Sequence, residues 1–166
     1  DLLDGSGTPA RRADVGLRGD RIAAVGALSG ATARRTLDCS GLTLAPGFLD
    51  VHSHSDAYLL IEAGAPSKVR QGITTVIAGN CGGSGWPVGE HLAKVETLGF
   101  KSNYAMLVGH HTIRSIAMEG SESPWPSHEQ TVAMQEMVRR GLDEGAIGVT
   151  VGYAQRHETF EEIVAV

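Results

Sequence analysis

Two histidines separated by one residue form the pattern with the most chemical content in this sequence. His52 and His54 directly follow the apolar residues 47–51, which are typical of a β-strand. Side chains alternate across a strand, so we expect both imidazoles to point the same way. Two imidazoles on one face can hold a divalent metal and leave positions open for water. Two unrelated surface histidines are the alternative.

A cysteine occupies a comparable position one strand later. Cys81 lies within residues 79–83, Gly-Asn-Cys-Gly-Gly, directly after the β-branched and apolar residues 73–78. A thiolate there could bind a metal or act as a nucleophile, and the flanking glycines let the backbone approach a ligand closely. A small buried cysteine is the alternative, and the nearby histidine pair favours the metal ligand.

Two acidic residues flank the histidine pair. Asp50 would point the same way as the histidines, where it could orient a metal-bound imidazole or make a hydrogen bond in the core. Asp56 could be a further ligand or a residue that caps the loop.

The two later strand ends also carry polar side chains. His110 and His111 are neighbours, so at most one can face a site, and a structural histidine is an equal interpretation. Tyr153 and Arg156 could bind a substrate carboxylate or be ordinary loop residues. The role of His157 stays open.

The elements that must position these residues alternate between strand and helix. Strands are predicted at residues 47–51, 73–78, 104–108 and 146–151, and helices at 66–71, 88–98, 128–142 and 159–166. This alternation favours an α/β fold with a parallel sheet, either doubly wound or the first half of a (β/α)8 barrel. In both folds ligands bind at the carboxyl ends of the strands, where His52, His54 and Cys81 lie.

The first 45 residues follow a different pattern. Short apolar segments at 13–18, 21–25, 35–37 and 42–44 predict a small antiparallel β unit, with Gly19-Asp20 as a hairpin turn. We therefore expect one domain at 1–45 and another at 46–166. A complete barrel needs about 250 residues, and no stop signal follows the last predicted helix, so we expect a fragment of a longer protein.

Composition excludes several functional classes. Hydrophobic residues make up 42% and charged residues 20%, as in soluble globular proteins. The formal net charge of −5 offers no basic surface for nucleic acid, and no apolar run approaches the ~20 residues that span a membrane. Cys39 and Cys81 make no disulfide framework, so we expect a cytoplasmic location.

Residues 45–54 resemble the signature of the amidohydrolase superfamily, in which a Pro-Gly-Phe-Ile-Asp-x-His-x-His strand opens a metal-binding barrel. Residues 19–26 are similar to the small β-sandwich repeat that precedes the barrel in these enzymes. Within the superfamily the chain looks most like the D-aminoacylase, or N-acyl-D-amino-acid deacylase, family. The segments that carry this likeness are 71–76, 79–82, 107–110 and 145–148.

The resemblance implies a small N-terminal β-sandwich portion followed by the first half of a (β/α)8 barrel. It makes His52 and His54 the first metal ligands and Tyr153 a substrate-binding residue. It makes Cys81 the ligand that replaces the carboxylated lysine of dihydroorotases and hydantoinases. The family's other metal histidines and its catalytic aspartate lie on later strands. We therefore expect no catalytic residue within this chain and no activity from it alone.

The implied reaction is zinc-dependent hydrolysis of a small molecule, an N-acyl-D-amino acid, to a carboxylate and a free D-amino acid. One or two zinc ions would lower the pKa of bound water towards ~7 and polarise the amide carbonyl, while a carboxylate passes a proton to the leaving amine. A thiolate beside imidazoles favours zinc over magnesium or calcium.

Other functions stay open at this point. A cyclic-amide hydrolase or an isoaspartyl dipeptidase of the same superfamily is one alternative, and a non-catalytic interaction module is another. The chain also departs from the family, because Ser55-Asp56 supplies one acid where a pair is usual, and no Pro-Gly follows Tyr153. The acyl group, the side-chain preference and the oligomeric state are therefore left open.

Overall fold

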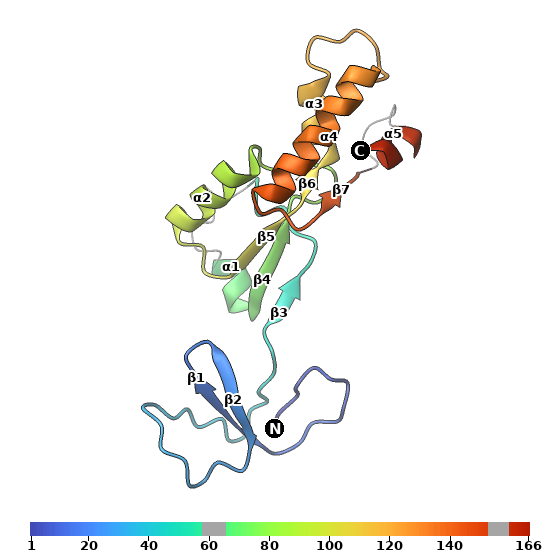
Figure 1. The fold of residues 1–166 in the computed structure, drawn as a ribbon. Coiled ribbons are helices and arrows are strands. Elements are labelled where there is room, and N and C mark those ends of the chain that lie inside the picture. The colour runs from blue at the N-terminus through green and yellow to red at the C-terminus, as the bar shows by residue number, and fades with distance from the viewer. Residues whose placement is uncertain (58–65, 153–159) are drawn as a thin grey trace. The chain divides into compact units, whose positions relative to one another are not determined.

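A computed structural model of the protein describes residues 1–57, 66–152 and 160–166. The chain divides into two compact units, residues 1–47 and residues 48–166 (Figure 1). None of the helices in the described ranges has the length and hydrophobicity needed to cross a bilayer.

The first unit contains one β-hairpin. Strands β1 (Asp14–Arg18) and β2 (Arg21–Gly26) pair antiparallel. The turn between them uses Gly19 at a φ of 62°, a left-handed conformation that suits glycine. The predicted hairpin is confirmed.

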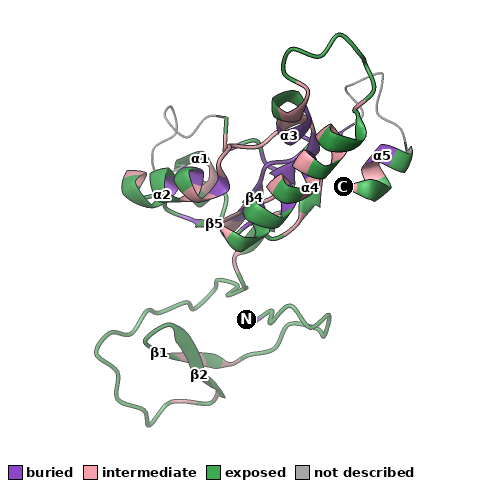
Figure 2. Cartoon of the chain, turned by 45° about the horizontal axis from the view of Figure 1, so that its top comes forward, coloured by how far each residue is buried: buried purple, intermediate pink, exposed green. Residues whose placement is uncertain are grey.

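The other strands expected in this unit do not form. Residues 35–37 make no strand, and Leu44 makes a single bridge to Leu2 that is parallel rather than antiparallel. Leu2 is the sole buried residue among residues 1–47, all of which the structure describes, and the unit is exposed almost throughout (Figure 2). Leu37 is exposed, so no buried face favours strand pairing there.

The second unit is built on parallel strands. They are β3 (Phe48–Asp50), β4 (Ile73–Ala78), β5 (Asn103–Met106), β6 (Val108–Gly109) and β7 (Val149–Thr150). One sheet has the order β3-β4-β5, and a second pairs β6 with β7. The parallel pairing predicted from the sequence is confirmed.

A single residue links the two parallel sheets. The Leu107 N–H donates to Ala78 O at 3.0 Å, and the next residue, Val108, donates to Gly148 O at 2.8 Å. The predicted strand at 104–108 is therefore split, because its two halves pair with different neighbours. Among the described residues, the paired strands follow one another in chain order (Figure 1).

Helices follow most of the strands. They are α1 (Pro66–Arg70), α2 (Val88–Leu98), α3 (His110–Ala117), α4 (His128–Asp143) and α5 (Phe160–Ala165). Helix α2 ends at Gly99 in the left-handed conformation, as predicted. Helix α4 begins after Ser127, whose side chain forms a capping box with Gln130.

Helix α3 was not expected from the sequence. His110 and His111 were interpreted as part of the end of the third strand, with no helix predicted between it and residue 128, and this prediction was wrong. The helix begins at His110, directly after β6, and no side chain caps its first turn. Ile113 is fully buried and helps to hold the helix on the unit.

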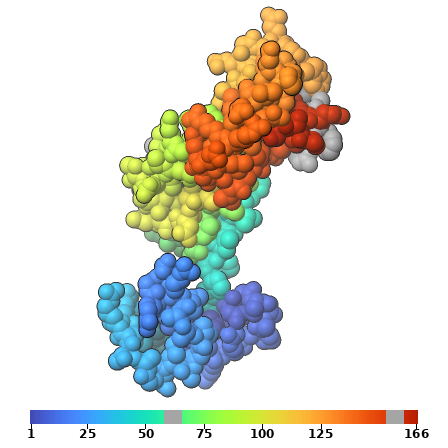
Figure 3. All heavy atoms as spheres, viewed as in Figure 1, coloured from blue at the N-terminus to red at the C-terminus, as the bar shows by residue number. Residues whose placement is uncertain are grey.

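The core of the second unit lies between the strands and helices α2, α3 and α4 (Figure 2). Its buried residues are Val88, Met106, Val108, Ile113, Met134, Val138 and Ala146. In the space-filling view the side chains of α4 lie beside those of α2 (Figure 3), where Glu144 Oε2 accepts a 2.9 Å hydrogen bond from Gly89 N–H.

A polar pair lies at the edge of this core. The Nε2 atom of His91, on α2, is 3.0 Å from the hydroxyl oxygen of Tyr104, on β5. Burial lowers the pKa of His91 below its ordinary value of 6.5 and raises the pKa of Tyr104. At neutral pH the two groups therefore form a neutral hydrogen bond between helix and sheet.

Replacing Gly141 with alanine should destabilise the protein. An added Cβ would lie 2.5 Å from Val108 Cγ2, so α4 would have to move off β6. We expect the free energy of unfolding, measured in urea, to fall by about 1–3 kcal/mol. Gly89→Ala is the matched control, because its Cβ would make an ordinary 3.5 Å contact with Glu144. Equal stabilities for the two variants would contradict the prediction.

The His91–Tyr104 pair predicts a pH dependence. The pKa of His91 is lower in the folded chain than in the unfolded chain, so the unfolded state binds more protons as the pH falls below 6.5. The free energy of unfolding should therefore fall from about pH 7.5 to about pH 5 more steeply in the wild type than in His91→Gln. His128→Gln, which changes an exposed histidine, should keep the wild-type slope. Parallel curves for wild type and His91→Gln would disprove this.

Candidate metal centre

The histidine pair lies in the loop that follows β3. The strand ends at Asp50, so His52 and His54 are not held by a strand pleat, and that part of the prediction was wrong. Hydrogen bonds position the loop instead. The Ser53 N–H donates to Ile77 O of β4 at 3.1 Å.

The side chains of this loop still alternate. Ser53 and Ser55 are buried, their hydroxyl oxygens lie 2.7 Å apart, and Ser55 N–H donates to Ser53 Oγ at 3.2 Å. His52 and His54 are exposed. The buried serines therefore anchor the loop, and both imidazoles point outward. The two histidines lie on the same side of the chain, as expected, but the buried serines and not a strand place them there.

The cysteine loop joins β4 to α2. Cys81 has a φ of 56°, an uncommon conformation for a residue with a side chain, and Gly79 and Gly82 each have a φ of 79°. Two glycines at neighbouring strand ends, Gly109 and Gly152, lie close to the backbone of this loop. A Cβ on Gly109 would lie 2.4 Å from Gly82 O, and one on Gly152 would lie 2.2 Å from Cys81 O. The loop fits here because both of these neighbours are glycines.

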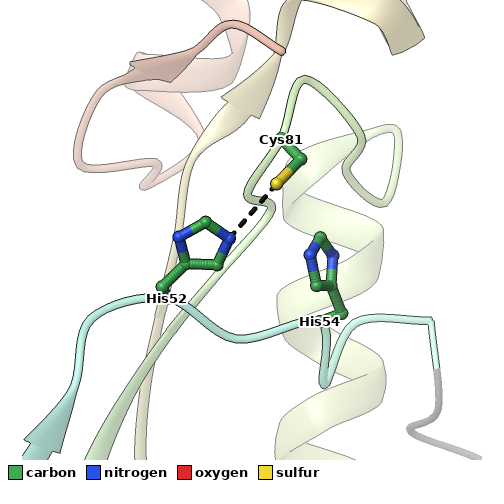
Figure 4. Close-up of side chains that lie close together, drawn as sticks. All are labelled: His52, His54 and Cys81. Carbon is green, nitrogen blue, oxygen red and sulfur yellow. Dashed lines mark hydrogen bonds between the residues drawn. The ribbon is translucent and has the colours of Figure 1, made fainter. Parts of the chain in front are cut away.

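The two loops bring the three predicted ligands together. The ligand atoms of His52, His54 and Cys81 all lie within 4.8 Å of one another. His52 Nε2 is 3.1 Å from Cys81 Sγ, and the His54 ring lies beside them (Figure 4). Ligands of one tetrahedral zinc lie about 3.5 Å apart. Two imidazoles and a thiol at this spacing are a donor set that suits zinc.

Asn80 links the two loops. Its buried side-chain amide donates to Ile77 O at 2.9 Å and to Ser53 O at 3.4 Å. Ser53 lies between the two histidines, so one amide fixes the histidine loop relative to the cysteine. The sequence analysis quoted Asn80 within the cysteine motif without giving it a role. The signal was a polar residue placed between a buried strand and a glycine-flanked cysteine.

Asp50 supports the histidine loop through the backbone. Its carboxylate accepts hydrogen bonds from Lys68 Nζ at 2.5 Å and from the N–H of His52 at 3.3 Å. The bond from Lys68 lowers the pKa of Asp50 below its ordinary value of 3.8, which keeps the carboxylate ionised. Asp56 is partly buried and is not one of the clustered metal-binding groups found among the described residues.

The histidines after β6 lie outside this cluster. His110 is buried, with its Nε2 3.3 Å from Glu162 Oε1 of α5, and the same oxygen accepts from Arg114 Nε at 2.7 Å. This arrangement joins α3 to α5. His111 Nε2 is 3.0 Å from Gly152 O. Tyr153 and Arg156, which were considered for substrate binding, lie outside the described residues, as does His157, whose role was left open.

The sequence of the chain is similar to those of known enzymes. Residues 35–164 match a family described as the amidohydrolase family. A D-aminoacylase from Alcaligenes xylosoxydans xylosoxydans is 38% identical over 99% of this chain, and an N-acyl-D-glutamate deacylase from the same organism is 41% identical over 92%. The chain spans 39% and 36% of the lengths of these two relatives.

Solved structures show the same likeness. The N-acyl-D-glutamate deacylase from Bordetella bronchiseptica, in complex with zinc and a phosphonate that mimics the tetrahedral intermediate, has a TM-score of 0.88 at 36% identity. A D-aminoacylase crystal structure has a TM-score of 0.90 at 36% identity. Both matches cover 99% of this chain and 40% of the solved chain.

The resemblance to D-aminoacylases that the sequence motifs indicated is confirmed by these relatives. With residues 35–164 matched and the histidine and cysteine loops brought together at the strand ends, the chain belongs to the amidohydrolase family.

Proposed function

We propose that the protein hydrolyses the amide bond of N-acyl-D-amino acids, with zinc bound by His52, His54 and Cys81. The observation that carries the proposal is the clustering of these ligand atoms within 4.8 Å. The relatives named D-aminoacylase and N-acyl-D-glutamate deacylase support the substrate class, and the zinc in the Bordetella bronchiseptica structure supports the metal. A further D-aminoacylase structure concerns a binuclear metal centre, so one or two ions are proposed.

The same proposal extends to the architecture. Strands β3 to β7 would be the first strands of a (β/α)8 barrel, and residues 1–45 would be part of a small β-sandwich. The parallel strands in chain order and the compact units at 1–47 and 48–166 support this division. Further metal histidines and the catalytic aspartate would lie beyond residue 166. The cytoplasmic location and the lack of a nucleic-acid partner stay predictions.

The residues of this chain would have distinct tasks in the reaction. Bound zinc supplies an acidified water and polarises the amide carbonyl. Cys81 would act as a thiolate and His52 and His54 as neutral imidazoles, because each must be deprotonated at the atom that binds the metal. Asn80 and Asp50 would hold the backbone on which the histidines lie. Tyr153 is proposed to contact the substrate.

A cyclic-amide hydrolase is the second candidate. A dihydroorotase from Bacillus licheniformis is 35% identical over 46% of this chain. The D-aminoacylase match covers 99% of the chain, including the cysteine loop, and therefore favours the deacylase. The assay below includes dihydroorotate to separate the two functions.

Replacing Cys81 with serine in the full-length enzyme that contains this chain should remove zinc and activity together. Changes to residues around a metal site cost about 10–100-fold in affinity or activity, and loss of a ligand should cost more. Zinc content is measured by atomic absorption. Turnover is measured on N-acetyl-D-amino acids, their L-enantiomers and dihydroorotate. Cys39→Ser is the matched control, since Cys39 is an exposed free cysteine in the first unit.

Two results would count against the proposal. Full zinc occupancy with normal turnover in Cys81→Ser would remove Cys81 from the site. A zinc-loaded full-length protein that hydrolyses none of the D-substrates would exclude the deacylase and favour a non-catalytic module. Residues 1–166 expressed alone should show no turnover, because they span 39% of the D-aminoacylase to which they are similar.

A further inference from the structure

We propose that His111 is a positioning residue, which holds Cys81 in its metal-binding position by joining the cysteine loop to the end of β7. The inference rests on the proposed function for the role of Cys81 as a ligand. The contacts that carry it are independent of any metal. They are a ring contact with Gly82, a hydrogen bond to Gly152 and the hydrogen bonds of the neighbouring Thr112.

Cys81 needs support from its surroundings. Its φ of 56° lies in the left-handed region, which is strained for a residue with a side chain. Such a conformation persists where neighbouring groups fix it. Cys81 is exposed, so its own side chain supplies little of this support. The groups that fix the loop must therefore contact its backbone.

His111 contacts that backbone on one side. A Cβ on Gly82 would lie 2.8 Å from both Cγ and Nδ1 of His111, so the imidazole lies against the bare Cα of the residue next to Cys81. The far side of the same ring is 3.0 Å from Gly152 O through Nε2. A carbonyl oxygen accepts hydrogen bonds, so Nε2 carries the proton and donates it.

Gly152 contacts the cysteine directly. A Cβ at this position would lie 2.2 Å from the carbonyl oxygen of Cys81 and 3.2 Å from its Cα. The peptide of Cys81 therefore lies against Gly152, and Gly152 is itself held by the imidazole of His111. The imidazole of His111 therefore contacts Gly82 on one side and Gly152 on the other, and Cys81 lies between these two glycines.

Thr112 fixes the next part of the loop. Its hydroxyl accepts from Ser84 N–H at 2.9 Å and donates to Ser84 O at 3.2 Å, and its own N–H donates to Gly82 O at 3.3 Å. Ser84 Oγ also accepts from Gly109 N–H at 2.9 Å. The first turn of α3 thus holds the loop on both sides of Gly83, and His111 adds the ring contact at Gly82, the residue after Cys81.

The consequence concerns the direction of the thiol. Cys81 Sγ lies 3.1 Å from His52 Nε2, and this spacing depends on the backbone angle at Cys81. Without the His111 ring, the loop gains space beside Gly82 and Gly152 loses its donor. The thiol should then sample other directions, and the three ligands should bind a metal less well.

The first test uses the metal-free protein. The rate of alkylation of Cys81 by iodoacetamide is followed by mass spectrometry of its peptide, with the Cys39 peptide as internal reference. We expect a several-fold faster reaction of Cys81 in His111→Ala and a rate near the wild type in His111→Gln, which retains an N–H donor. His128→Ala, at an exposed histidine of α4, should match the wild type.

The second test uses cobalt in place of zinc. A cobalt–thiolate bond gives a near-ultraviolet charge-transfer absorption, which reports directly on the Cys81 ligand. We expect this band to weaken in His111→Ala and the cobalt affinity to fall about 10–100-fold, with recovery in His111→Gln. Cys81→Ser should abolish the band.

The outcomes separate the two proposals. Wild-type alkylation rates together with an unchanged band in His111→Ala would overturn the positioning role. Faster alkylation with no band in the wild type would support the positioning role and reject Cys81 as a ligand. Equal defects in His111→Gln and His111→Ala, with a folded far-ultraviolet spectrum in both, would contradict the assigned hydrogen bond to Gly152.

Discussion

Close contact between backbones at the ends of the parallel strands is the constraint on which the site depends. The cysteine loop lies against Leu107, which joins β5 to β6, against Gly109, which ends β6, and against Gly152, which follows β7. A Cβ at Gly79 would lie 2.5 Å from Leu107 O, and the distances at Gly109 and Gly152 are as short. Side chains at these glycines would push the loop outward and separate Cys81 from the histidines. The donor set therefore exists because several strand ends carry no side chain.

Hydrogen bonds then set the histidines against that loop. Ser53 is held by Ile77 O through its N–H and by Asn80 through its carbonyl, so β4 and the residue before Cys81 both position it. Asp50, kept ionised by Lys68, fixes the N–H of His52. Each contact reaches the backbone rather than an imidazole, which leaves the ring nitrogens of His52 and His54 available to a metal.

The sequence predicted elements whose signals are local. The β-branched residues of β4, Gly99 at the end of α2 and Ser127 at the start of α4 each act within a few residues, and all three were found. Helix α3 was missed because no side chain caps its first turn, and because contacts such as that of Thr112 with Ser84, 28 residues away, give no local signal. Asn80 gained its role in the same way, from a partner in another loop. The clustering of His52, His54 and Cys81 was predicted from their types and spacing, but the loop that orients the histidines was not.

One helix holds two parts of the second unit. Helix α3 contacts Gly152 through His111, and it contacts Glu162 of α5 through His110 and Arg114. A shift in the packing of α3 would therefore reach the end of β7 and helix α5 at the same time.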